Sequence, residues 1–172
     1  MPLLAWARRA PISFRVDFVM SQCINRIDHV VWLVHSENQQ DYVDKLSKLF
    51  RTQFDGPLVR PEFGTRFWVS WEAGLEIFAP WGDNDYAKMW IQRLEQKGEG
   101  VLSVVVGVRD IEEASTHARQ LGYPVSQIIG FSGDEPWKDK LESFREAIIG
   151  DALGTLLGFG EIRYADGVIE TE

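Results

Sequence analysis

An internal repeat constrains the fold of this chain more than any other feature of its sequence. Residues 27–34 align without gaps with residues 101–108, and both segments have the apolar pattern of strands covered on two faces. Late in each half, residues 74–77 also resemble residues 159–162. A repeat of this length predicts two copies of one supersecondary unit, neither of which buries its sheet face alone.

Both halves are predicted to run strand, helix, strand, strand, strand. In the first half, apolar residues at helical spacing follow Ser36, a residue type that caps helices, and Gly and Pro residues bound the strands. The expected elements are a strand at 27–34, a helix from Ser36 to about Phe50, a short strand at 52–54, a hairpin of 65–71 and 75–79, and a linking helix at about 85–96.

The second half has the same order after a Gly-Glu-Gly linker at 98–100. Asp110 is expected to cap its helix, and the polar segment 132–140 is expected to form a surface loop. The expected elements are strands at 101–108, 125–130, 144–149 and 155–164, and a helix from Asp110 to about 121.

The first 22 residues differ in composition from the rest of the chain. The stretch up to Met20 contains three arginines and a single acid among its apolar residues. We interpret residues 1–22 as an N-terminal extension outside the fold, with Met20 as a second candidate start and residues 13–18 as a candidate edge strand. The remainder divides into a first module with its linking helix at 23–97 and a second module at 98–172.

Charge and cysteine content exclude several classes of partner. The formal net charge is −8, so nucleic acid and anionic membranes are not expected to bind. Cys23 is the single cysteine, which excludes an internal disulfide and a cysteine-rich zinc site and fits a cytoplasmic protein. No apolar run approaches the roughly 18 residues that a bilayer-spanning helix needs. A small organic molecule is the expected partner.

The repeat resembles the vicinal oxygen chelate superfamily, which includes glyoxalase I, bleomycin-resistance proteins and extradiol dioxygenases. Three segments carry the resemblance, which covers about residues 24–164: IDHVVWLV, GLEIFAPWG and GEGVLSVVVGVRDIEEA. It implies an α+β fold with two βαβββ modules in one chain, whose curled mixed sheets form a cleft. It also implies a divalent metal in that cleft in many members, and a homodimer.

His29 is a polar residue on an otherwise apolar strand face. It shares that face with Val31 and Leu33, and burying an unpaired polar group costs about 2 kcal/mol or more. The hairpin at 65–79 offers Glu76 as a partner. Such a pair would raise the pKa of His29 and orient its ring as a potential acid or base.

The resemblance implies a ligand from the first strand of each module and a carboxylate or amide from the last. His29 and Glu76 match these positions in the first module, and both suit Zn, Mn, Ni or Fe. In the second module the histidine position falls on Ser103, which is a poor ligand. The last position is Glu161 in the register of the internal repeat and Gly158 in the usual spacing of the family; the sequence leaves both open.

Aromatic residues near Glu76 give a second indication. A three-residue hairpin loop would place Ser70 opposite Glu76. The same register would place Trp68 opposite Phe78, whereas a two-residue turn would place Trp71 beside the carboxylate. In either register an aromatic ring lines the wall, where it fills the core or forms a stacking surface for a flat, partly apolar molecule.

These residues support two hypotheses about function. The first is a small-molecule-binding protein of the glyoxalase or bleomycin-resistance type, with an incomplete metal site and no bound metal. The alternative is a metal-dependent, glyoxalase-like lyase or isomerase that acts on a carbonyl-containing metabolite. An extradiol dioxygenase is disfavoured because its two histidines and glutamate cannot be assembled. The candidate catalytic or metal-binding residues are His29, Glu76 and Glu161, and the candidate ligand-binding residues are Trp68, Ser70, Trp71, Phe78 and Ser103.

Overall fold

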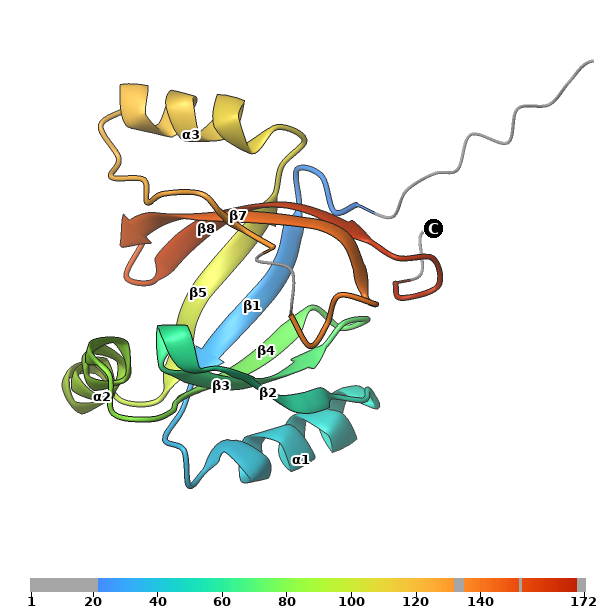
Figure 1. Ribbon diagram of the computed structural model, residues 1–172, viewed down its shortest axis with the longest axis vertical. Helices are drawn as coiled ribbons and strands as arrows, with labels where there is room; N and C mark the ends of the chain where they lie inside the picture. The colour runs from blue at the N-terminus through green and yellow to red at the C-terminus, as the bar shows by residue number, and fades with distance from the viewer. Residues whose placement is uncertain (1–21, 132–134, 152, 170–172) are drawn as a thin grey trace, which may run out of the picture.

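The computed structural model describes residues 22–131, 135–151 and 153–169 (Figure 1). The expected extension, with Met20 and the candidate edge strand at 13–18, lies outside the described residues apart from residue 22. The elements are β1 (Ile27–Leu33), α1 (Gln39–Phe50), β2 (Asp55–Arg60), the 3-10 helix η1 (Pro61–Phe63), β3 (Thr65–Ser70), β4 (Leu75–Pro80), α2 (Asp85–Lys97), β5 (Gly100–Gly107), α3 (Ile111–Gln120), β6 (Ile129–Gly130), β7 (Leu141–Asp151) and β8 (Leu156–Tyr164).

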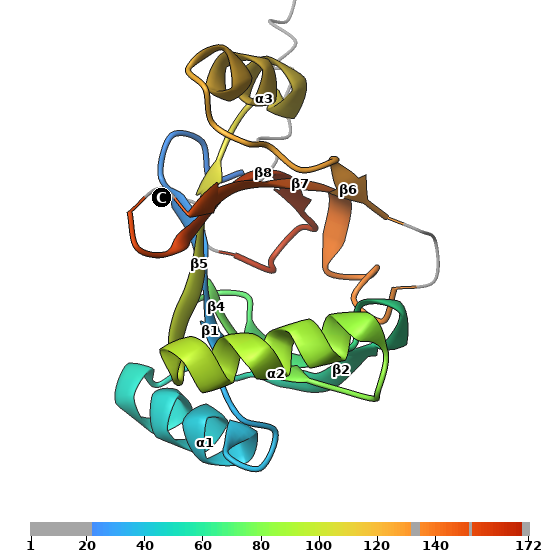
Figure 2. The ribbon, with the colours of Figure 1, turned by 90° about the vertical axis from the view of Figure 1, so that its left-hand side faces the viewer.

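The described strands form one 8-stranded mixed sheet in the order β2-β3-β4-β1-β5-β8-β7-β6. Within each module the first strand pairs in parallel with the last, β1 with β4 and β5 with β8. The two modules join through the antiparallel pair of β1 and β5. Figure 2 shows that the sheet curls, so that β7 and β8 lie opposite β2 and β4. The predicted α+β fold of two βαβββ modules around a cleft is confirmed.

The helices cover the outside of the curled sheet. α1 packs on the first module and α3 on the second, while α2 runs beside β4 (Figures 1 and 2). Under α1, Val43 meets Val34 and Ile77 in a buried cluster. In α3, the predicted cap is confirmed, because Asp110 Oδ1 accepts hydrogen bonds from the amides of Glu112 and Glu113. None of the helices among the described residues has the length and apolar character to cross a membrane.

Three expected elements differ from the structure. The first helix begins after Asn38 rather than at Ser36, whose hydroxyl instead donates to the carbonyl of Pro80 at 2.6 Å. The short strand expected at 52–54 lies later, as β2, and includes Pro57. Proline is tolerated there because, among the described residues, β2 is an edge strand that pairs with β3 alone. The strand expected at 125–130 shrinks to the two residues of β6.

Candidate functional site

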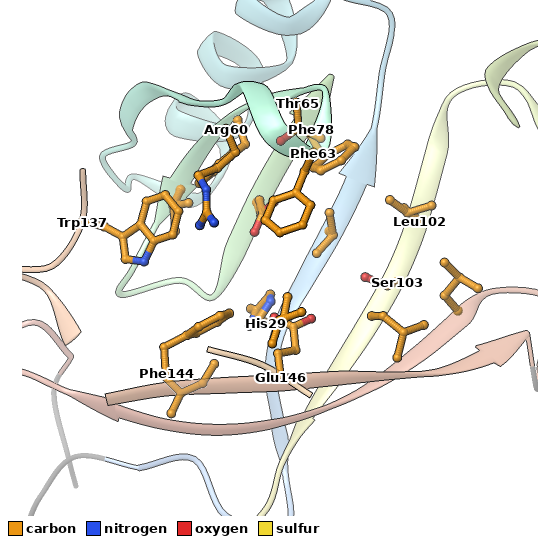
Figure 3. Close-up of a pocket in the computed structure, with 18 of the residues that line it drawn as sticks. His29, Arg60, Phe63, Thr65, Phe78, Leu102, Ser103, Trp137, Phe144 and Glu146 are labelled. Carbon is orange, nitrogen blue, oxygen red and sulfur yellow. The ribbon is translucent and has the colours of Figure 1, made fainter. Parts of the chain in front are cut away.

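A cavity of about 510 Å³ lies on the concave side of the sheet, between the two modules (Figure 3). Much of its lining follows strand alternation, as in Phe144, Glu146 and Ile148 of β7. Most of the wall is apolar, and a few polar groups meet at one end. The aromatic wall includes Phe67, Trp71, Phe78, Trp90, Trp137 and Phe144.

His29 lies at the polar end and is held by its neighbour in the sequence, Asp28. The Nδ1 atom of His29 lies 2.8 Å from Oδ1 of Asp28. The hydroxyl group of Tyr164, on β8, donates to the same carboxylate oxygen at 2.7 Å. Adjacent residues on a regular strand point to opposite faces, but the register of β1 on β5 is irregular between Ile27 and His29. Since Nδ1 is engaged, Nε2 is the ring nitrogen left for a ligand.

The sequence predicts Glu76 as the partner of His29, and the structure corrects this prediction in part. The hydrogen bond of His29 goes to Asp28, whereas Glu76 acts on it only through charge. Glu76 lines the cavity from β4, and Glu146 lines it from β7, next to His29 in Figure 3. Two carboxyl groups and one imidazole therefore share the polar end.

Burial and mutual charge shift the pKa values of all three groups. Burial alone would lower the pKa of His29, but the hydrogen bond to Asp28 and the charges of Glu146, Asp28 and Glu76 raise it to about 9. Burial raises the pKa of Glu76 to about 7, although the His29 cation opposes the shift. Burial also raises the pKa of Glu146, again against the effect of His29. At neutral pH the site thus holds an imidazolium and a carboxyl group poised between its two protonation states.

The structure does not bring Glu161 to the site. Glu161 is on β8, and its carboxylate points outward to α3, where it accepts the amide N–H of Ile111 at 3.0 Å. The same oxygen lies 3.3 Å from the guanidinium of Arg145. Inward positions of this strand belong to residues of the other parity, such as Ile162 and Tyr164. Glu161 thus accepts a hydrogen bond at the N-terminus of α3, on the outer face of the sheet.

Strand register places Gly158, rather than Glu161, at the fourth ligand position. Val31 is the partner of Glu76 in the β1–β4 ladder, and Val105 is the partner of Gly158 in the β5–β8 ladder. Val31 and Val105 each follow the first ligand position of their module by two residues. Gly158 is therefore the equivalent of Glu76, and this position has no side chain.

The residues at the polar end do not fit the metal site that the fold family implies. Ser103 lines the cavity and is a weak ligand, and Gly158 offers no side-chain donor. In the described ranges, no three His, Cys, Asp or Glu side chains are arranged to hold a metal ion.

Four of the five expected ligand-binding residues line the cavity: Ser70, Trp71, Phe78 and Ser103. Trp68 does not, because it points outward and packs on the cluster beneath α1. Both expected hairpin registers are wrong. A turn over residues 71–74 pairs Ser70 with Leu75 and Val69 with Glu76.

Sequence reasoning missed Asp28, Glu146, Tyr164 and Arg60. Glu146 had a signal, because it alternates with Phe144 and Ile148 and so interrupts an apolar strand face, as His29 does. Arg60, the last residue of β2, lines the cavity away from His29 (Figure 3). Its guanidinium lies 4.8 Å from the ring centre of Phe63 and 5.2 Å from that of Trp137.

No family model matches the sequence, and no curated protein matches it either. Solved structures do match. Streptomyces coelicolor methylmalonyl-CoA epimerase, in complex with 2-nitronate-propionyl-CoA, is 19% identical with a TM-score of 0.61, over 80% of this chain and 96% of that chain. Methylmalonyl-CoA epimerase from Mycobacterium tuberculosis is 16% identical with a TM-score of 0.57, over 84% and 92%. A hypothetical protein from Bacillus halodurans is 19% identical with a TM-score of 0.56, over 86% and 95%. At this level of identity the likeness shows the fold.

Proposed function

We propose that this chain, which has the vicinal oxygen chelate fold, binds a small organic molecule in the cavity between its modules without a metal ion. The cavity itself carries the proposal. It measures about 510 Å³, its walls are mostly aromatic and aliphatic, and its few polar groups converge at one end. Concave, mostly apolar cavities with a few convergent polar groups are the usual form of small-molecule sites.

Each part of the cavity has a role in this proposal. Aromatic rings such as Phe67, Trp71 and Phe78 contact the body of the ligand, and His29 and Glu76 contact its polar end. The epimerase from Streptomyces coelicolor was solved with a CoA ester bound, which supports the use of this fold for small organic ligands. The homodimer that the sequence resemblance implies stays a prediction.

Blocking the cavity tests this proposal. Ligands from a small-molecule library that raise the melting temperature of the parent should lose that effect in Ser103→Phe, because Ser103 lines the cavity and is buried. Circular dichroism of the variant checks that it folds. Glu142→Gln, on an exposed position of β7, serves as the control that keeps ligand binding. Equal stabilisation of Ser103→Phe and parent would place the ligand elsewhere and contradict the proposal.

A second candidate is an enzyme that moves a proton on a carbonyl-containing metabolite. One observation favours it: the pKa of Glu76 is about 7, which is suited to a general base at neutral pH. Its metal-dependent form has less support, because the donor residues do not fit a metal ion. The test is exchange of the proton next to the carbonyl of acyl thioesters in D2O, followed by NMR. Loss of exchange in Glu76→Gln but not in the exposed Glu72→Gln supports it, and no exchange by the parent rejects it.

A further inference from the structure

We propose that the ligand of this cavity is an organic cation, with an amine or quaternary ammonium group between Glu76 and Glu146 and an apolar part against the aromatic wall. This inference rests on the proposed function, because it names the chemical class of ligand for the same cavity. Three observations carry it: the charge balance at the polar end, the pairing of the nearby cations, and the aromatic lining.

The charge balance at the polar end leaves two carboxyl groups without a counter-ion. Asp28 offsets the charge of His29 at 2.8 Å and also accepts the hydroxyl of Tyr164. The other two acids, Glu76 and Glu146, face the same space from opposite arms of the curled sheet. In the described part of the chain, neither carboxyl group accepts a hydrogen bond or forms an ion pair.

The nearby basic side chains are paired elsewhere. Among the residues described as lining the cavity, only His29 and Arg60 are basic. The guanidinium of Arg60 forms an ion pair with Glu62 and lies 4.0 Å from an oxygen of Glu135. Arg145, next to Glu146 in the chain, lies on the outer face with Glu161. When the two inward carboxyl groups are ionised, the positive charge that would balance them is therefore one that a ligand supplies.

The aromatic walls of the cavity suit both the apolar part of an organic cation and its positive charge. Aromatic faces attract cations through their quadrupole, most strongly when water is excluded. Two rings of this cavity already contact a cation, because the Arg60 guanidinium lies over both Phe63 and Trp137. An anionic group at the polar end would instead face Glu76 and Glu146, and like charges in a partly buried site repel strongly. The site thus selects by charge and favours cations.

A matched set of three probes tests the inference. Phenylbutylammonium, phenylbutanol and phenylbutanoate share one carbon skeleton and differ in the charge of the end group. Titration calorimetry at pH 8 should give the cation an affinity about tenfold or more above that of the alcohol, since one close charge pair of this kind contributes a factor of this size. The anion should bind more weakly than the alcohol.

Two variants test whether the preference for the cation depends on Glu76 and Glu146. Glu76→Gln and Glu146→Gln should each reduce the affinity for phenylbutylammonium at least about fivefold and leave that for phenylbutanol unchanged. The exposed Glu72→Gln and Glu142→Gln should change neither affinity. Equal or tighter binding of the alcohol or the anion to the parent would overturn the inference while leaving small-molecule binding intact. If the parent binds none of the three probes, the inference fails, whereas the proposed function is decided separately by the library experiment with Ser103→Phe.

Discussion

At the scale of single residues, Asp28 sets the chemistry of His29 through one hydrogen bond. A buried carboxylate on Nδ1 fixes the orientation of the ring and favours its protonated form. The second oxygen of the same carboxylate is buried and has no hydrogen-bond partner within the described chain. Because an unsatisfied buried charge is costly, the contact with the His29 imidazolium matters more for the stability of the Asp28 carboxylate. The two side chains therefore act as a unit.

Removing the charge of Asp28 should lower the pKa of His29. In Asp28→Asn the amide keeps the shape of the carboxylate but not its charge, so the pKa should fall from about 9 toward the ordinary value of 6.5. The measurement is an NMR pH titration of the imidazole resonances, with His35 and His117 as internal references. An unchanged pKa would mean that Asp28 does not control the protonation of His29.

Replacing Glu76 by glutamine should stabilise the fold, and only at high pH. The pKa of Glu76 rises from 4.5 to about 7 on folding, chiefly through burial, so the folded chain loses stability as pH rises through that interval. We expect Glu76→Gln to be more stable than the parent by about 2 kcal/mol at pH 8 and equal to it at pH 4. Urea unfolding at both pH values measures this, with Glu72→Gln as the exposed control. A difference independent of pH would contradict the assignment.

At the scale of elements, strongly patterned strands could be predicted from the sequence, but their registers could not. His29, Glu76 and Ser103 lie at the cavity as expected, because they occupy apolar strands with clear alternation. The pairing of Asp28 with His29 depends on a local irregularity of β1 that leaves no trace in hydrophobic periodicity. The direction of Glu161 likewise follows from the register of β8 on β5, which side-chain alternation alone does not fix.

On the outer face, Glu161 should contribute to stability and not to ligand binding. Its carboxylate accepts the amide of Ile111 at the start of α3, so Glu161→Ala should destabilise the fold by about 1 kcal/mol. Glu161→Gln keeps the acceptor and should lose less. Urea unfolding and titration with a cavity ligand separate the two effects. A loss of ligand affinity in either variant would indicate that Glu161 takes part in ligand binding and would contradict this prediction.

At the scale of the whole molecule, the two modules share one continuous sheet and should unfold together. The antiparallel pair of β1 and β5 joins them, and Glu99, at the start of the second module, accepts hydrogen bonds from the first at His35, Asn38 and Tyr42. A cavity formed between two halves also couples them, because a ligand bound there contacts both.

This coupling predicts a single cooperative transition. Urea unfolding followed by tryptophan fluorescence, far-UV circular dichroism and NMR signals of each module should give coincident curves. A bound ligand should move all of them to higher urea together. Different urea midpoints for the two modules would show that they unfold independently despite the shared sheet.

The surroundings of Gly158 determine how a side chain could be placed at the fourth ligand position. A Cβ atom there would lie 3.3 Å from Cγ2 of Val105, 3.4 Å from the carbonyl oxygen of Ala147 and 3.5 Å from Cδ1 of Ile148. A side chain at this position therefore needs Val105 to shift by a few tenths of an ångström, whereas the contacts with Ala147 and Ile148 are ordinary van der Waals distances. Restoring the donor set that the fold family implies would therefore take Gly158→Glu and Ser103→His together, with Val105 as the residue that has to make room.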